Sequence, residues 1–374
     1  MFFGLELAQL QVYWWVVVSL LGGLLVFMFF VQGGQGLIDK LAKTEEEKSL
    51  LINVLGRKWE LGFTTLVLFG GACFAAFPLF YSTSFGGAYW VWLAILLCFI
   101  IQAVSYEYRK KQGNLLGAKT YETFLKINGI LGVFLIGVAV STFFSGSAFR
   151  LDEMRFVRWE HSLRGLEQLG NAFNYLLGFA LVFLSRMLAD SYFINALDSR
   201  DSGEIIHRAK RDLLLNTALF LPLFLGFLAW ICVKDGFYVD ESGAVSMQAY
   251  LYLATFLQKP YLLILLLVGV VLVLAGIYLS LVGKKGIFAL GAGAVCAVMA
   301  VLLNVGLGES AFYPSSTDLQ SSLTIANASS SYYTLSVMGY VSLLVPFVLG
   351  YIIYVWRCMD SKKLGLRDMD EHAY

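Results

Sequence analysis

Long stretches without any Asp, Glu, Lys, Arg or His side chain constrain this 374-residue chain more than any other feature. A helix needs roughly 20 apolar residues to cross the hydrocarbon core, and backbone groups in lipid must be hydrogen-bonded internally. The charge-free stretches are 7–38, 61–106, 127–149, 168–185, 213–233, 260–283, 286–308 and 319–356. The second is long enough for two spans with a turn at 81–87. We therefore expect nine transmembrane helices, centred near residues 21, 71, 96, 135, 179, 222, 271, 297 and 345.

Composition supports an all-α polytopic membrane protein rather than a soluble domain. Hydrophobic residues make up 59% of the chain and charged residues only 14%, against about 25% charged in soluble proteins. The net charge of +1 gives no indication of nucleic-acid binding.

The layout of helices and charged loops repeats once, which predicts two four-helix bundles plus one peripheral helix. The first four-helix unit is expected over 1–148, an outside loop over 149–170, and the second unit over 171–308. Residues 309–374 would form another outside loop, helix nine and a cytoplasmic tail. Apolar residues from Leu151 to Leu169 recur at roughly helical spacing. This spacing predicts a short amphipathic helix on the membrane surface.

The distribution of basic residues predicts the orientation. Most Lys and Arg residues fall in the loops after helices one, three, five and seven and in the C-terminal tail. Loops rich in Lys and Arg stay in the cytoplasm, so we expect the N-terminus outside and the C-terminus cytoplasmic. The first helix has no basic n-region and no small-residue cleavage site, and we expect a retained span.

The residue types that hold redox centres are sparse. The histidines His161, His207 and His372 all lie outside the expected spans, whereas haem in a membrane bundle is usually ligated by intramembrane His or Met. The five cysteines are scattered without metal-site spacing. We therefore expect no haem or metal to be ligated by this chain. The absence of a P-loop motif argues against an ATPase or kinase.

Ionisable residues at membrane depth are the default functional candidates. Glu60 begins helix two beside Trp59, where an acid is also favoured simply by the helix dipole. Arg186 and Asp190 lie four apart on helix five. This spacing allows an ion pair on one face, for which a structural role is the simpler interpretation.

Two groups of motifs carry a resemblance to a known family. In the first, a Trp-acid pair starts helix two, a Gly-Gly-Ala-rich run leads to Pro78, and an aromatic-acid-Tyr-Arg sequence ends helix three at Arg109. The second is a Pro-Ser-Ser-Thr run before helix nine. The chain thereby resembles subunit II of the cytochrome bd quinol oxidases. The motif residues are Trp59, Gly70, Gly71, Pro78, Arg109, Pro314, Ser315, Ser316 and Thr317.

The resemblance implies a subunit of an electrogenic, non-pumping quinol oxidase that reduces O₂ in the bacterial inner membrane. The obligate partner, subunit I, would carry two haems b, one haem d and the quinol-oxidising site. Subunit II would bind no haem, would stabilise subunit I, and would contribute to a proton path. In some members it contributes an O₂ path or a structural quinone site. Lipid and a small single-helix accessory subunit are further expected partners.

The proton-path candidates are Glu60, Gln32 and Glu107. Glu60 matches the family's acid after the Trp. Gln32 stands where many members carry an acid, and Gln102 replaces a family Arg. An amide cannot relay a proton as an acid does, so the route through this subunit is open. A secondary transporter is the alternative function, although paired broken helices typical of transporters are missing.

Overall fold

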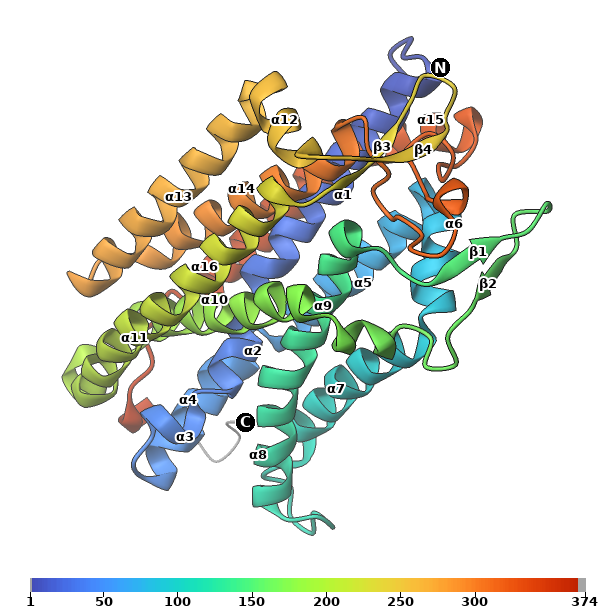
Figure 1. Cartoon of the computed structure of the whole chain (residues 1–374). Coiled ribbons are helices and arrows are strands. Elements are labelled where there is room, and N and C mark those ends of the chain that lie inside the picture. Colours follow the sequence, from blue (N-terminus) through green and yellow to red (C-terminus); the bar gives the residue numbers. More distant parts are fainter. Residues whose placement is uncertain (1, 369–374) are drawn as a thin grey trace.

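The computed structural model describes residues 2–368, which are predominantly helical (Figure 1). The helices of the first half are α1 (Leu7–Met28), α2 (Phe30–Gln35), α3 (Ile38–Leu41), α4 (Glu45–Gly56), α5 (Trp59–Ala76), α6 (Pro78–Tyr81), α7 (Tyr89–Tyr108), α8 (Ala118–Ile127) and α9 (Val133–Ser145). Two π-helical turns, η1 (Ser82–Gly87) and η2 (Asn128–Gly132), interrupt them.

The second half contains helices and two β-hairpins. The helices are α10 (Ala172–Ala196), α11 (Ser199–Val233), α12 (Leu251–Gln258), α13 (Pro260–Leu281), α14 (Gly286–Leu307), α15 (Tyr332–Ser342) and α16 (Val345–Met359). The strands are β1 (Phe149–Leu151), β2 (Val157–Trp159), β3 (Gly236–Val239) and β4 (Val245–Gln248), which form two antiparallel hairpins. Short 3₁₀ turns are η3 (Leu166–Gly170), η4 (Leu319–Ser321) and η5 (Leu366–Asp368).

Nine segments within residues 2–368 are long and apolar enough to cross a membrane, as the charge-free stretches predict. They are 7–35, 45–76, 89–108, 118–145, 172–196, 199–233, 260–281, 286–307 and 332–359. Helix α11 has 35 residues and begins well before the predicted span at 213. It is roughly 50 Å long at 1.5 Å per residue, so His207 lies in a part that extends beyond the apolar stretch.

Helices α13 and α14 pack through small residues. A Cβ atom at Gly293 would lie 2.6 Å from the carbonyl oxygen of Gly269, and one at Gly269 would lie 2.8 Å from the backbone nitrogen of Ala297. Real Cβ atoms do not approach so closely, and glycine alone allows the two backbones to meet here. Gly293 and Ala297 of α14 therefore lie at a close contact with Gly269 of α13.

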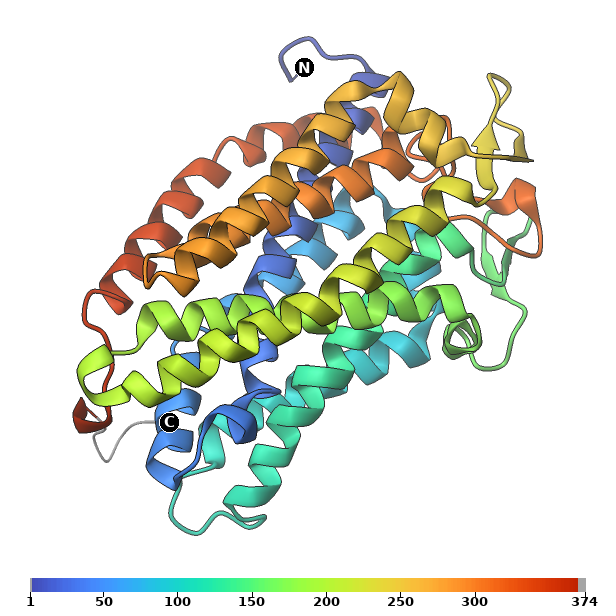
Figure 2. The same cartoon turned by 60° about the vertical axis from the view of Figure 1, so that its left-hand side comes forward.

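Each of the two large hydrophobic clusters of the described chain contains residues from both expected four-helix units. Trp15 of α1 donates from Nε1 to the carbonyl of Leu302 in α14 at 3.0 Å. Gly33 of α2 lies directly against the backbone of Ser185 in α10. Helices α10 and α11 run side by side along the bundle (Figure 2). The division into units stays a prediction, and these contacts tie the units together.

The prediction of an amphipathic helix within 149–170 is wrong. Most of this segment forms the β1–β2 hairpin, in which Phe149 lies opposite Trp159. Its side chains alternate, with Phe149 buried and Arg150 exposed. The turn is fixed by Asp152, whose Oδ1 accepts hydrogen bonds from the backbone of Met154 and Phe156, and by Arg155 at φ 61. Hydrogen bonds from the backbone to an Asp side chain, as in this turn, take the place of helical hydrogen bonds.

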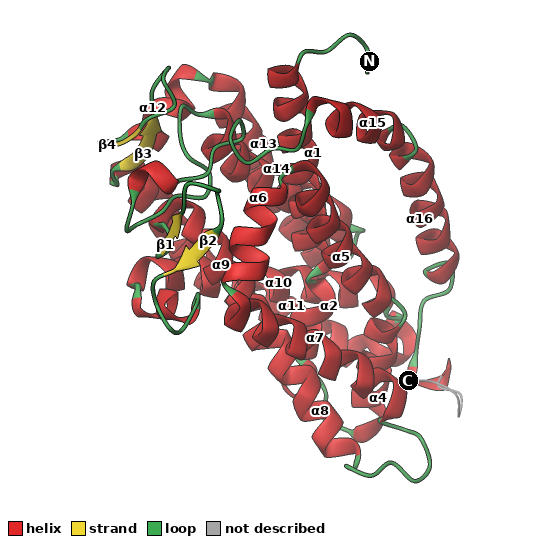
Figure 3. Ribbon diagram, turned by 90° about the vertical axis from the view of Figure 1, so that its right-hand side faces the viewer, coloured by secondary structure: helices red, strands yellow, loops and turns green. Residues whose placement is uncertain are grey.

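The last two helices lie apart from the bundle over most of their length (Figure 3). Only 11% of the apolar window of 332–359 is buried within the chain. At one end, Trp14 donates to the carbonyl of Leu335 at 3.1 Å. At the other, the ring of Trp356 lies 5.8 Å from that of Phe27, and Lys58 contacts Asp360 at 2.9 Å. The peripheral helix is thus fastened mainly at its ends.

Candidate functional site

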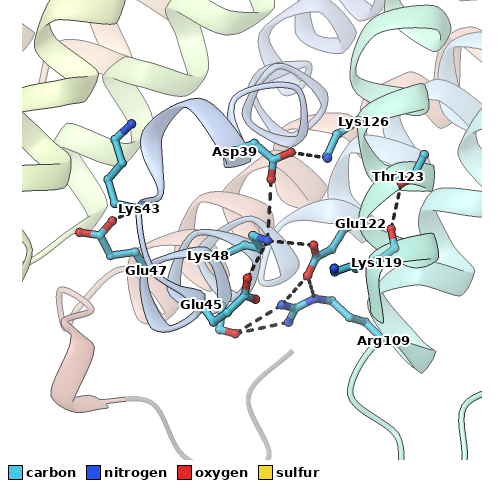
Figure 4. A network of polar contacts seen from close by, with 11 residues as sticks. Asp39, Lys43, Glu45, Glu47, Lys48, Arg109, Lys119, Glu122, Thr123 and Lys126 are labelled. Atoms are coloured by element: carbon cyan, nitrogen blue, oxygen red, sulfur yellow. Dashed lines mark hydrogen bonds and ion pairs between the residues drawn. The ribbon is translucent and has the colours of Figure 1, made fainter. Parts of the chain in front are cut away.

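A network of charged side chains occupies the end of the bundle formed by α3, α4 and α8, which we call the charged end (Figure 4). Lys48 contacts Glu122 at 3.1 Å and Glu45 at 3.0 Å. Glu122 also accepts hydrogen bonds from Nε and Nη2 of Arg109, at 3.0 and 2.9 Å. Lys126 pairs with Asp39. Arg109, a motif residue, therefore holds the end of α7 against α4 and α8.

Sequence reasoning missed Glu122, although it carries the centre of this network. Its side chain is 6% exposed, so it is shielded by the helices around it. The one signal was its position four residues before Lys126 on α8, a spacing that is ordinary on a solvated helix. Its partners come from distant parts of the chain, which no local pattern indicates.

A cluster of uncharged amides lies deeper in the bundle, at the junction of α2, α7 and η2. Oε1 of Gln102 accepts hydrogen bonds from Gln32 at 2.8 Å, Gln35 at 2.7 Å and Asn128 at 2.6 Å. Gln35 also donates to the hydroxyl of Tyr106 at 3.0 Å. All four amide residues have 0% exposure. Gln32 and Gln102, the two positions where the resemblance implies a departure from the family pattern, therefore contact each other directly.

Glu60 has a different setting, because its side chain is exposed on the surface of the chain. It lies in the first turn of α5. The preceding Trp59 is buried and stacks on Tyr106, with ring centroids 5.9 Å apart. Lys58 turns inward and lies 5.0 Å over the ring of Trp356. Within residues 2–368, Glu60 has no hydrogen-bond or ion-pair partner.

The remaining predicted residues are not brought together with Glu60. Glu107 is exposed near the end of α7 and approaches Lys111 at 3.8 Å. Arg186 and Asp190 form no ion pair within 4.0 Å among the described residues, although their spacing allows one. Asp190 instead accepts a hydrogen bond from Asn216 at 2.9 Å.

The Pro314–Thr317 run lies at the opposite end of the bundle and holds β1 in place. Oγ of Ser315 and Oγ1 of Thr317 both donate to the carbonyl of Phe149, at 2.5 and 3.1 Å. The backbone nitrogen of Ser316 donates to the carbonyl of Ser147 at 2.9 Å. This motif therefore organises a loop and is remote from the charged end.

The described histidines do not fit an intramembrane haem. His161 is exposed in the loop after β2, 3.8 Å from Glu167, and His207 is exposed on α11. His372 lies outside the described residues. Among residues 2–368, no group of three or more His, Cys, Asp or Glu side chains could hold a metal ion.

Comparison with known proteins identifies the family to which this chain belongs. The sequence model described as cytochrome bd terminal oxidase subunit II matches residues 10–359. The chain belongs to this family. It is 28% identical to the cytochrome bd-I ubiquinol oxidase subunit 2 of Escherichia coli K12, over 94% of this chain and 95% of that protein. It is 27% identical to the cytochrome bd ubiquinol oxidase subunit 2 of Bacillus subtilis 168, over 96% and 98% respectively.

A solved structure shares the fold. The bd oxidase structure from Geobacillus thermodenitrificans aligns with a TM-score of 0.59 at 12% identity, covering 94% of this chain and 98% of that chain. The nine apolar helices found within residues 2–368 and membership of the subunit II family make this a multi-pass protein of the bacterial inner membrane.

Gly70 and Gly71 of α5 make almost no packing contact within residues 2–368. A Cβ atom at Gly71 would meet nothing within 4 Å, and one at Gly70 would only reach Phe85 at 3.8 Å. Around them, Val67 and Phe74 are 59% and 60% exposed. Small residues on an open helix face allow close approach of another helix. Within residues 2–368, this face of α5 is therefore open enough for another helix backbone to approach.

Proposed function

We propose that this chain is the haem-free subunit II of a cytochrome bd-type quinol oxidase and stabilises the haem-bearing subunit I. The family match over residues 10–359 carries the proposal, and the exposed positions of His161 and His207 support it. The haems b, haem d and the quinol-oxidising site would belong to the partner. Because the chain belongs to this family, we no longer propose a secondary transporter.

The partner face would comprise α5 and α16. Only 22% of the apolar window of 45–76 and 11% of that of 332–359 is buried in this chain. On α16, Phe347, Tyr351 and Tyr354 are 66–76% exposed. Obligate interfaces are large and hydrophobic, and aromatic residues are enriched in them. The open glycines of α5 allow a second helix backbone to approach, which lipid alone does not require.

Glu60 would supply protons to the partner rather than to the interior of this chain. It lies at the first turn of the same helix, α5, and points outward from the bundle surface. A subunit packed on α5 would cover its carboxylate and place it between the charged end and the haem-bearing subunit. The amide cluster around Gln102 is uncharged and cannot itself exchange a proton. Its role would be structural, holding α2, α7 and η2 together.

The orientation that suits this role has the charged end in the cytoplasm. The charged end carries Lys40, Lys43 and Lys48, in agreement with the bias of basic residues toward cytoplasmic loops. Exchanging Glu60 for Gln in the assembled oxidase tests the proton role, because turnover should then fall while haem content stays normal.

A further inference from the structure

A second buried polar cluster lies between α3, α10 and α11, and no motif of the family includes it. Asp190 is 0% exposed, Asp212 4% and Asn216 1%. The Nδ2 group of Asn216 donates to Oδ2 of Asp190 and to Oδ2 of Asp212, both at 2.9 Å. One neutral amide thus bridges two buried carboxyl groups on neighbouring helices.

The cluster reaches the surface through one cation. Asp212 forms an ion pair with Lys40 of α3, and the Lys40 side chain is 48% exposed. Asp190 lies behind this pair. The charged groups that face Asp190 are Asp212, Lys40 and Arg186. The next residue on α10, Ser191, bonds at 2.6 Å to Ser280 of α13, which adds no charge.

The charges in the cluster are not fully compensated by contacts. Lys40 pairs with Asp212, whereas Asp190 has no cation within 4.0 Å among the described residues. Its Oδ1 atom has no hydrogen-bond partner there, and neither has Oδ1 of Asn216. An ionised carboxylate buried with one neutral donor beside a second carboxylate is costly. A proton on Asp190 removes this charge, and Asn216 Oδ1 is an unused acceptor in the same cluster.

We propose that Asp190 binds one exchangeable proton, that the Asn216 bridge holds its carboxyl group beside that of Asp212, and that Lys40 connects this site to the charged end. The proton comes from water at the charged end and is taken up without any change in covalent bonds or redox state. The site is separate from Glu60 and involves only residues of this chain. It therefore goes beyond the proposed function.

Infrared difference spectroscopy of the assembled oxidase in H₂O and D₂O tests the proposal. The wild-type complex should show a C=O stretching band of a protonated carboxylic acid that shifts in D₂O. Asp190→Asn, which preserves shape, should lose one such band, and Asp190→Glu should move it. Asp198 caps the start of α11 by accepting a hydrogen bond from the backbone nitrogen of Arg200 at 3.0 Å. Asp198→Asn is the matched control, because Asn also serves as an N-cap, and it should leave the band in place.

A band that persists unmoved in both Asp190→Glu and Asp212→Asn would overturn the assignment, as would its absence from the wild-type complex. Asp190→Glu keeps a carboxyl group, so the test stands even if Asp190→Asn does not assemble. The proposed role of Lys40 in connecting Asp190 to the surface is tested by a separate measurement. Lys40→Met should slow hydrogen-deuterium exchange of the band several-fold, whereas Lys43→Met at the same end should not; equal rates would refute the role of Lys40.

Discussion

Arg109 and Glu122 form a two-pronged ion pair, in which Nε and Nη2 of the guanidinium both donate to Oε1 of the carboxylate at 3.0 and 2.9 Å. The two side chains are only 5% and 6% exposed. Charge-assisted hydrogen bonds of this geometry are strong. The pair joins the ends of α7 and α8, and through Lys48 it reaches α4.

Removing one member of this pair should destabilise the protein more than removing both. We expect Arg109→Leu to cost about 3–5 kcal/mol because it leaves the Glu122 charge buried with fewer partners. Arg109→Leu combined with Glu122→Leu should recover part of that loss. Thermal unfolding of the purified oxidase measures both. Additive losses in the double variant would contradict the buried pair.

Glu60→Gln should lower quinol oxidase turnover roughly tenfold while haem content stays normal, because a positioned acid contributes strongly to proton transfer. Turnover and the haem spectrum are measured on the same preparation. Glu204→Gln, an exposed acid on α11, is the control and should keep wild-type turnover. Unchanged turnover in Glu60→Gln would remove this residue from the proton path, and lost haem would indicate a structural role.

Gln102→Leu should destabilise the bundle by a few kcal/mol, since each buried donor left without its acceptor costs about 1–3 kcal/mol. Gln32, Gln35 and Asn128 all donate to Gln102 Oε1. The measurement is the temperature at which haem absorbance is lost from the complex. Gln11→Leu is a comparison outside this cluster, because Gln11 bonds to the loop before α15. Equal stability of Gln102→Leu and wild type would show that the amide cluster is not structural.

Gly71→Leu should leave this chain folded but prevent assembly. The space around Gly71 is open in the chain, so a larger side chain clashes only with a partner helix. Gly203→Leu on α11 is the matched control, since its surroundings are equally open. The ratio of subunit I to subunit II after affinity purification reports the difference. Equal recovery of subunit I with both variants would move the interface away from α5.

The nine spans could be predicted from sequence because the cost of burying charge in lipid acts on each segment separately. The β1–β2 hairpin could not, because Asp152 fixes a local turn and Ser321 of a distant loop bonds to Leu151. The polar clusters could not be predicted from sequence either. Glu60 and Arg186 were visible as charges at membrane depth, whereas the partners Glu122 and Asn216 depend on which helices become neighbours.

We propose above all that this chain works bound to a haem-bearing subunit. The most direct measurement is affinity purification of the tagged chain from native membranes in mild detergent, followed by a reduced-minus-oxidised spectrum of the product. We predict a second polytopic chain together with b-type and d-type haem bands. A chain that purifies alone and without haem would contradict the account.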